Sequence, residues 1–179
     1  AVHDDNPEVH EAHRRGIPVF ERTQAWGALM RGYQNALCIS GTHGKTTTTS
    51  MCTHIMMAAE KDPTVMIGGT LPLLKARHRV GKGNTIIMES CEYYNSFLAL
   101  NPTIAVVLNI EADHLDFFKD LEDIKHSFRC FAERVPAETG TVIANYDDAN
   151  TMDALRGIAR KVITFGLNAK ADVYAQNIV

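Results

Sequence analysis

The sequence feature that most constrains the fold is a glycine-rich segment at residues 40–50, which reads SGTHGKTTTTS. The short apolar stretch before it, residues 36–39, has the composition of a strand buried in a parallel sheet. Residues 51–59, which follow it, carry apolar side chains at helical spacing. We therefore expect a strand, a glycine loop and a helix in that order, which is the context that a phosphate-binding loop requires.

The residue types in this loop suit an anion. Gly41 and Gly44 allow the backbone to approach a bulky phosphate, and the N–H groups of the loop and of the first helical turn point at it. Lys45 adds a positive charge for phosphate oxygens, and the Thr46 hydroxyl is placed to bind a phosphate-bound Mg²⁺. The general pattern has a further glycine where this chain has Ile39, so the loop is the shorter form G-x-x-G-K-T. The alternative is an ordinary turn that opens a helix, but the flanking strand and helix favour the phosphate loop.

Strand and helix patterns alternate along the rest of the chain. Strands are expected at residues 17–20, 36–39, 62–69, 85–88, 102–108, 141–144 and 161–165, and residues 175–179 look like part of another. Helices are expected at residues 7–16, 23–32, 51–59, 121–132 and 151–159, the first capped by Asn6 and the second by Thr23. This alternation predicts an α/β fold, with a mostly parallel sheet covered by helices on both faces.

Composition excludes some classes of partner. The net charge of −3 gives no basic footprint, so nucleic acid is not expected as a partner. No apolar run approaches the length of a membrane span, and the first residues have no signal-peptide character. The four cysteines are widely spaced, which is typical of buried, reduced thiols in the cytoplasm. Because the chain lacks an initiator methionine and stops in a strand-like sequence, we expect it to be part of a longer protein.

Polar residues follow two further predicted strands. Glu89 comes directly after the strand at 85–88, and the run from Asn109 to His114 follows the strand at 102–108. Ligands of an open parallel sheet bind beyond the carboxyl ends of its strands, so these residues are expected to share one site with the glycine loop. A carboxylate and an imidazole there could ligate the Mg²⁺ ions that a phosphate loop recruits. Each residue alone could be a surface or turn residue, and it is their joint occurrence that favours a site.

Four segments together resemble the Mur ligase family of peptidoglycan synthesis. They are residues 41–51, residues 62–64 with 67–69, Glu89 with residues 96–98, and residues 109–114. The resemblance covers the whole chain. The resemblance implies a three-domain enzyme with a UDP-sugar domain, a central ATPase domain and a third domain that closes over the nucleotide. Residues 1–35 would be the tail of the first domain, and residues 36–179 most of the second, incomplete at its end. This chain alone is therefore not expected to catalyse the full reaction. A basic stretch at residues 75–82 is either a solvated loop or hairpin or a contact for an anionic substrate.

Within the family, His43 is typical of the branch that joins L-alanine to the lactyl carboxylate of UDP-N-acetylmuramate through an acyl phosphate. The resemblance implies ATP and Mg²⁺ as cofactors and these two molecules as substrates. The recycling branch, which attaches a tripeptide to the same nucleotide sugar, shares the histidine and is the closest alternative. Alternatives from other classes are a nucleotide-binding switch, a phosphate-loop kinase and a module that binds ATP without catalysis. The joint presence of Glu89 and His114 argues against the last. The sequence does not give the oligomeric state.

The resemblance also implies a role for individual residues. The ATP phosphate loop would comprise Gly41, Thr42, His43, Gly44, Lys45, Thr46 and Thr47. Lys45 would contact the β- and γ-phosphates, Thr46 and Glu89 would hold one Mg²⁺, and His114 would serve a second Mg²⁺ near the acyl acceptor. Glu92 and Asn109 would orient the substrate or support the residues that do.

The chain departs from the family pattern in two places. Many relatives carry further acids beside Glu92, where this chain has Cys91, Tyr93, Tyr94 and Asn95. Relatives often end the helix after the loop with a glycine, where this chain has Glu60 followed by Lys61. A role of the missing acids does not transfer to this chain, and the sequence offers no ordinary cap for the helix.

Overall fold

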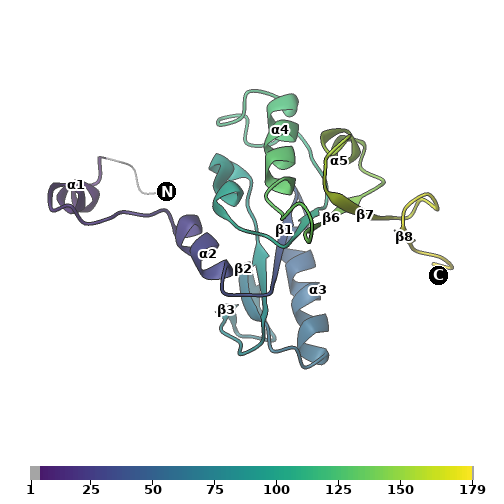
Figure 1. The fold of residues 1–179 in the computed structure, drawn as a ribbon, viewed down its shortest axis with the longest axis horizontal. Helices are drawn as coiled ribbons and strands as arrows, with labels where there is room; N and C mark the ends of the chain where they lie inside the picture. Colours follow the sequence, from purple (N-terminus) through teal and green to yellow (C-terminus); the bar gives the residue numbers. More distant parts are fainter. Residues whose placement is uncertain (1–4, 179) are drawn as a thin grey trace.

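The fold is an α/β structure, and its computed structural model describes residues 5–178 (Figure 1). In chain order the elements are α1 (Pro7–Arg14), α2 (Arg22–Met30), β1 (Asn35–Ser40), α3 (Lys45–Ala58), β2 (Thr64–Leu71), β3 (Ala76–Arg79), β4 (Thr85–Glu89), the 3-10 helix η1 (Tyr93–Ala99), β5 (Ile104–Val107), α4 (Leu121–Ala132), β6 (Thr141–Asn145), α5 (Ala149–Ala154), β7 (Lys161–Gly166) and β8 (Val173–Tyr174). Among the described helices, none is long and apolar enough to span a lipid bilayer.

The strands form one sheet with the order β3-β2-β4-β1-β5-β6-β7-β8. Every neighbouring pair is parallel except β2 and β3, which form an antiparallel hairpin. The prediction of a mostly parallel sheet is therefore confirmed. β1 lies between β4 and β5, so the chain leaves β1 where the strand order changes direction, and this is where ligands of open parallel sheets bind.

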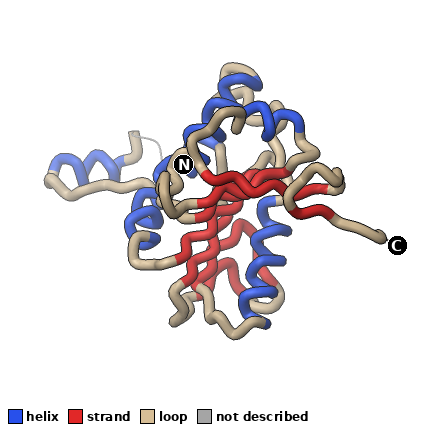
Figure 2. Tube along the Cα trace, turned by 45° about the vertical axis from the view of Figure 1, so that its right-hand side comes forward, coloured by secondary structure: helices blue, strands red, loops and turns tan. Residues whose placement is uncertain are grey.

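Helices cover both faces of the sheet, as the sequence predicted (Figure 2). On one face α3 packs over β1, β2 and β4, and its Cys52 and Met56 contact a core that includes Ile39 and Ile87. On the other face α4 and η1 enclose the larger core. In that core Phe97 stacks on Phe131 with ring centroids 4.6 Å apart. Strands buried on both faces explain why they read as continuous apolar runs rather than as alternating ones.

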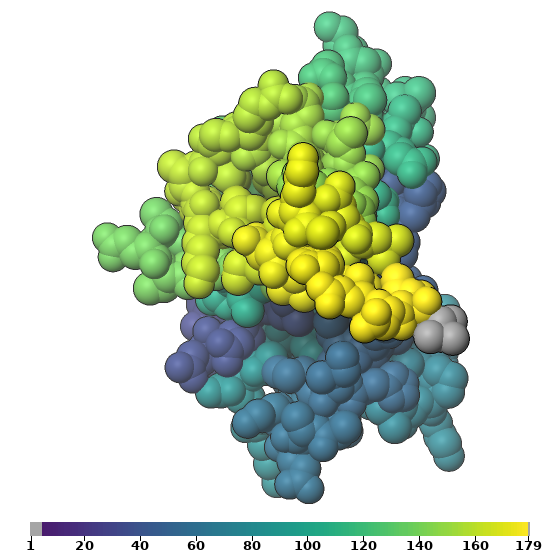
Figure 3. Space-filling model, turned by 90° about the vertical axis from the view of Figure 1, so that its right-hand side faces the viewer, coloured from purple at the N-terminus to yellow at the C-terminus, as the bar shows by residue number. Residues whose placement is uncertain are grey.

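The two ends of the chain lie on the outside of this body. Helix α1 has no buried residue and stands away from the sheet, joined to it through an extended segment (Figure 1). Helix α2 packs against η1, and Asn101 donates a hydrogen bond to the Gly27 carbonyl at 2.8 Å. At the other end, the residues after β7 cover the outer surface beside α3 and α5 (Figure 3).

Three predicted strand assignments are wrong. Residues 17–20 form no strand, because no neighbouring strand pairs with them, and Ile17, Val19 and Phe20 are exposed. Strand β2 does not end at the glycines but continues through them to Leu71, with a shift in its register against β3. The last strand is β8, at Val173–Tyr174, so residues 175–178 are not in a strand, and residue 179 lies outside the described part.

The helix assignments differ from prediction mainly at their ends. Asn6 caps α1 as expected, since its side chain accepts a hydrogen bond from the Glu8 N–H at 2.9 Å. The N-cap of α2 is Glu21 rather than Thr23, and the Glu21 N–H donates to the Gln24 side chain. Helix α4 has the predicted limits, whereas α5 begins earlier and ends earlier than predicted. The 3-10 helix η1 was not predicted.

None of the four cysteines forms a disulfide. Cys38 is buried in β1, and burial raises the pKa of its thiol to about 12, which keeps it protonated. Cys91 is exposed, so the expectation that the cysteines are buried is wrong for this residue.

The end of α3 shows how this helix is terminated without a glycine. Glu60 adopts the left-handed conformation, with φ of 55°, and its N–H and that of Lys61 donate to the carbonyls of Met57 and Met56. This is the arrangement that glycine normally supplies at a helix C-terminus, here adopted by a residue with a side chain. Such a conformation costs about 1–2 kcal/mol for a residue other than glycine.

We therefore expect Glu60→Gly to stabilise the protein by about 0.5–1 kcal/mol, since part of the relieved strain is offset by the greater freedom of glycine in the unfolded chain. Glu60→Ala is the matched control, because it removes the same exposed side chain but keeps the strain. Urea denaturation measures both variants. A glycine variant no more stable than the alanine variant would contradict this explanation.

Candidate functional site

The site is built on the loop that joins β1 to α3. Gly41 and Gly44 have φ of 144° and 81°, conformations that side chains rarely adopt. A Cβ atom at Gly41 would lie 2.9 Å from the Cβ of Leu108, so the loop can pack against the end of β5 only with glycine there. The two glycines therefore stand where the backbone conformation of the loop requires them.

The loop presents hydrogen-bond donors at the start of α3. The first N–H groups of a helix have no acceptor within it, and Gly44, the N-cap, has no side chain that could bind them. The dipole of α3, which is 14 residues long, adds positive potential at the same point. This end of α3 is therefore suited to bind a phosphate group.

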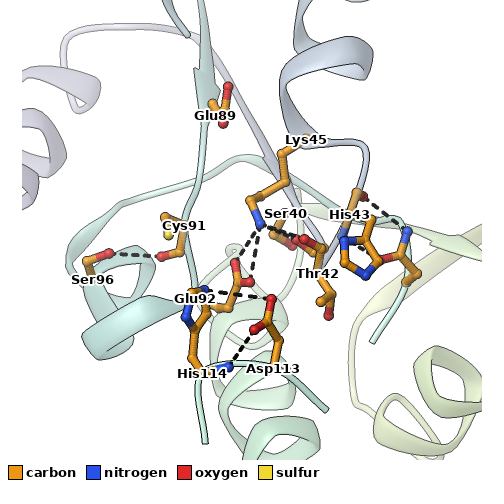
Figure 4. A network of polar contacts seen from close by, with 12 residues as sticks. Ser40, Thr42, His43, Lys45, Glu89, Cys91, Glu92, Ser96, Asp113 and His114 are labelled. Carbon is orange, nitrogen blue, oxygen red and sulfur yellow. Dashed lines mark hydrogen bonds and ion pairs between the residues drawn. The ribbon is translucent and has the colours of Figure 1, made fainter. Parts of the chain in front are cut away.

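Lys45 does not extend into solvent but folds back over the loop (Figure 4). Its ammonium donates to the carbonyls of Gly41 and Thr42 at 2.6 and 3.0 Å. It also contacts both carboxylate oxygens of Glu92, at 3.0 and 3.2 Å. The exposed fraction is 14% for the Lys45 side chain and 3% for that of Glu92, so this is a buried ion pair.

Thr46 and Glu89 meet beside the loop. Glu89 is the last residue of β4 and pairs in register with Ile39 of β1, which brings its side chain to the same edge as the loop. The Thr46 hydroxyl donates to Glu89 Oε1 at 2.9 Å, and the Gly68 N–H donates to Oε2 at 2.7 Å. A Cβ atom at Gly68 would lie 2.5 Å from Oε1, so a side chain there would displace the Glu89 carboxylate from this position. Two adjacent oxygen groups of this kind fit Mg²⁺, which prefers oxygen ligands and keeps several waters or phosphate oxygens.

Asn109 fixes the outer part of the loop. Its Oδ1 accepts a hydrogen bond from the His43 N–H at 2.7 Å, and its Nδ2 donates to the His43 carbonyl at 3.1 Å. Beside it, the Thr42 hydroxyl accepts from the Glu111 N–H at 2.9 Å. The segment after β5 therefore acts as a support on which the loop rests.

His114 lies on the far side of Glu92 from Glu89 (Figure 4). Its backbone is in the left-handed conformation, with φ of 52°, and its N–H donates to Asp113 Oδ1 at 2.7 Å. Its ring stacks on Tyr93, with centroids 4.3 Å apart and an interplanar angle of 25°. The Tyr93 hydroxyl donates to Asp116 at 2.5 Å, and this carboxylate raises the pKa of the Tyr93 phenol above its ordinary value.

The structure thus gathers the predicted residues at one edge of the sheet, in two groups. Glu89, Glu92 and Asn109 each contact a different residue of the loop, whereas His114 stands in a second group with Tyr93. Within residues 5–178, no three His, Cys, Asp or Glu side chains are grouped so that they could hold a metal ion by themselves. Any Mg²⁺ here would therefore need oxygens from phosphate or water as well. Sequence reasoning did not anticipate the contacts of Tyr93 with His114 and Asp116, and no motif or spacing in the sequence pointed to them.

A model of the Mur ligase middle domain matches residues 39–179. UDP-N-acetylmuramate--L-alanine ligase from Caldanaerobacter subterraneus subsp. tengcongensis is 45% identical over 178 residues, which are 99% of this chain and 38% of that protein. This chain therefore spans little more than a third of the length of that curated relative.

Two solved structures share the fold. The crystal structure of UDP-N-acetylmuramate-alanine ligase MurC from Thermotoga maritima aligns with a TM-score of 0.77 and 27% identity, covering 96% of this chain and 38% of that one. The ligase MPL from Neisseria meningitides, described as a UDP-N-acetylmuramate:L-alanyl-gamma-D-glutamyl-meso-diaminopimelate ligase, aligns with a TM-score of 0.81 and 27% identity, covering 92% and 56%.

The contacts of Asn109 generate a prediction about anion binding. Asn109→Ala removes two hydrogen bonds to the loop, each worth about 0.5–1.5 kcal/mol. We expect the affinity for inorganic tripolyphosphate, measured by isothermal titration calorimetry, to fall about tenfold, which equals about 1.4 kcal/mol. Asn84→Ala, which removes an exposed amide before the start of β4, is the control and should bind as the unmodified chain does. Unchanged affinity in a folded Asn109→Ala variant would show that the loop does not depend on this support.

Proposed function

The chain belongs to the Mur ligase family, and we propose that it forms the central ATP-binding part of a ligase that joins L-alanine to UDP-N-acetylmuramate. Residues 36–179 would be most of the central domain, and residues 1–35 the tail of a preceding UDP-sugar domain. The observation that carries the proposal is the phosphate loop with Lys45 above it and the Thr46–Glu89 pair beside it. The identity of 45% to a UDP-N-acetylmuramate--L-alanine ligase supports the choice of substrates.

The reaction must overcome the low reactivity of a carboxylate toward an amine. ATP supplies the phosphoryl group that turns the lactyl carboxylate into an acyl phosphate, from which the amine of L-alanine displaces phosphate. The task of the protein is to position the groups and to stabilise the charge on the transferred phosphoryl group. Lys45 and the N–H groups at the start of α3 would bind the phosphates.

Metal ions would share the phosphate charge. Thr46 and Glu89 would hold one Mg²⁺, with phosphate and water oxygens as its other ligands. His114 would contact a second Mg²⁺ near the acyl acceptor, and the Tyr93 ring would limit the orientations open to its imidazole. An imidazole is a less usual ligand for Mg²⁺, so the second site depends more strongly on oxygen groups of the substrate.

The recycling ligase that attaches a tripeptide is the second candidate. The structural similarity to MPL favours it, with a TM-score of 0.81 against 0.77 for MurC. The sequence favours L-alanine, because an L-alanine ligase is 45% identical over 99% of this chain. The 27% identity to the MPL structure equals that to the MurC structure and does not separate the two. We give the sequence more weight, since two enzymes with the same fold can differ in substrate.

The two candidates differ in the amine that they need. In a three-domain enzyme that carries this chain, we expect release of phosphate from ATP to require UDP-N-acetylmuramate and L-alanine together. The tripeptide L-alanyl-γ-D-glutamyl-meso-diaminopimelate should not replace L-alanine, and a colorimetric phosphate assay measures both. A tripeptide-dependent release would assign the chain to the recycling reaction, and release without any amine or carboxylate would point to a nucleotide switch.

Lys45 gives the test of the phosphate loop. Lys45→Ala removes a charged donor to the transferred phosphoryl group, and such donors are worth a factor of about 100 or more in turnover. We expect at least this loss in the same enzyme, with Lys170→Ala, at an exposed position, as a control that keeps its activity. Because Lys45→Ala also leaves the buried Glu92 carboxylate unpaired, thermal unfolding must first show that the variant is folded. Near-normal turnover in a folded variant would refute the role of Lys45.

A further inference from the structure

The contacts of Lys45 leave its ammonium fully occupied by the protein. An ammonium group has three hydrogens to donate. The structure gives it four oxygen neighbours within 3.2 Å, namely the carbonyls of Gly41 and Thr42 and the two oxygens of Glu92. A phosphate oxygen can therefore gain a hydrogen bond from Lys45 only if one of these partners gives it up.

The fold holds Glu92 firmly against the loop. It lies at the start of η1, and only 2% of its surface is exposed. The Glu92 carbonyl accepts a hydrogen bond from the Asn95 N–H at 2.8 Å, and the Cys91 carbonyl accepts one from the Phe97 N–H at 3.0 Å. Because Phe97 is buried against α4, the backbone around Glu92 is anchored to the larger core. The carboxylate is therefore held against the loop and is not free to turn into solvent.

The charges of the two possible partners of Lys45 are alike. Glu92 is a carboxylate, and an incoming phosphate is also an anion, so the two repel each other if both approach the same ammonium. Repulsion is stronger where water is excluded, as it is around Glu92. The loop carbonyls, by contrast, are neutral and can stay in contact with Lys45 while a phosphate binds.

We propose that Glu92 competes with the phosphates of the nucleotide for the Lys45 ammonium and so lowers the affinity of the loop for them. Binding is then an exchange of ion pairs rather than the filling of a preformed site. The proposal rests on the proposed function, because it assumes that the loop binds ATP. It gives Glu92 the role of an affinity-determining residue for the same site.

The exchange has a signature that a purely structural role of Glu92 lacks. Only ligands whose phosphates reach Lys45 take part in the competition. Neutralising Glu92 should therefore strengthen the binding of tripolyphosphate and of an unhydrolysable ATP analogue and leave that of adenosine unchanged. A general loss of structure would not strengthen the binding of the two phosphate ligands while leaving that of adenosine unchanged.

Glu92→Gln is the variant that tests this, because glutamine has nearly the same shape and removes the negative charge. We expect it to bind tripolyphosphate and the ATP analogue about tenfold more tightly than the unmodified chain, measured by isothermal titration calorimetry without Mg²⁺. Glu111→Gln is the matched control. It removes a carboxylate at the same edge of the sheet, but one that is exposed and lies against His43 rather than Lys45. Its affinities should change by less than half as much on a logarithmic scale.

Each outcome decides one question. If a folded Glu92→Gln variant binds the ligands as tightly as the unmodified chain, or more weakly, the competition is overturned. The proposed function then remains intact. Failure of both chains to bind either ligand overturns the phosphate site itself. If Glu92→Gln does not fold, Glu92→Asp replaces it, since a shorter carboxylate reaches Lys45 less well. That variant should then bind tripolyphosphate about threefold more tightly, and no gain would overturn the proposal.

Discussion

The parallel pairing of β1 with both β4 and β5 is the constraint on which the site depends. Parallel strands end at the same edge of a sheet, so the register that places Glu89 beside Ile39 and Val107 beside Ser40 also brings together the three segments that follow these strands. These segments are far apart in the sequence, and none of them could form the site alone. Glycine at position 41 completes the arrangement, because the loop must pass within van der Waals distance of Leu108.

Those parts of the fold that depend on local pattern could be predicted from the sequence. Helix α4 has the predicted limits because its apolar residues repeat at helical spacing and Asp120 caps its start. The strand predicted at residues 17–20 is wrong because its formation depends on distant parts of the chain. Residues that favour strands form one only where a neighbouring strand offers hydrogen-bond partners. The left-handed Glu60 could not be foreseen either, because its sequence carries no glycine to mark the turn.

For the site, the sequence predicts which residues lie at the edge of the sheet but not which side chains they contact. The positions of Lys45, Glu89 and Asn109 at the edge of the sheet follow from the strand pattern. Their partners do not, because these depend on the path of loops between residues far apart in sequence. Glu92 reaches Lys45 from the short turn between β4 and η1, and this part of the chain left no periodic signal in the sequence. The stacking of His114 on Tyr93 likewise joins the segment after β5 to the start of η1, two parts of the chain whose approach has no local signal in the sequence.

The hydrogen bonds at this edge explain how several acids can lie close to a site for an anion. Each carboxylate is held by a donor of the protein: Glu89 by Thr46 and Gly68, Glu92 by Lys45, and Asp116 by Tyr93. A phosphate that takes some of these donors leaves carboxylates with an uncompensated charge, and this cost is high where water is excluded. A divalent cation that enters with the phosphate supplies the missing positive charge. If the loop binds ATP as proposed, the same acids that oppose a bare phosphate would favour a phosphate that arrives with its metal ion.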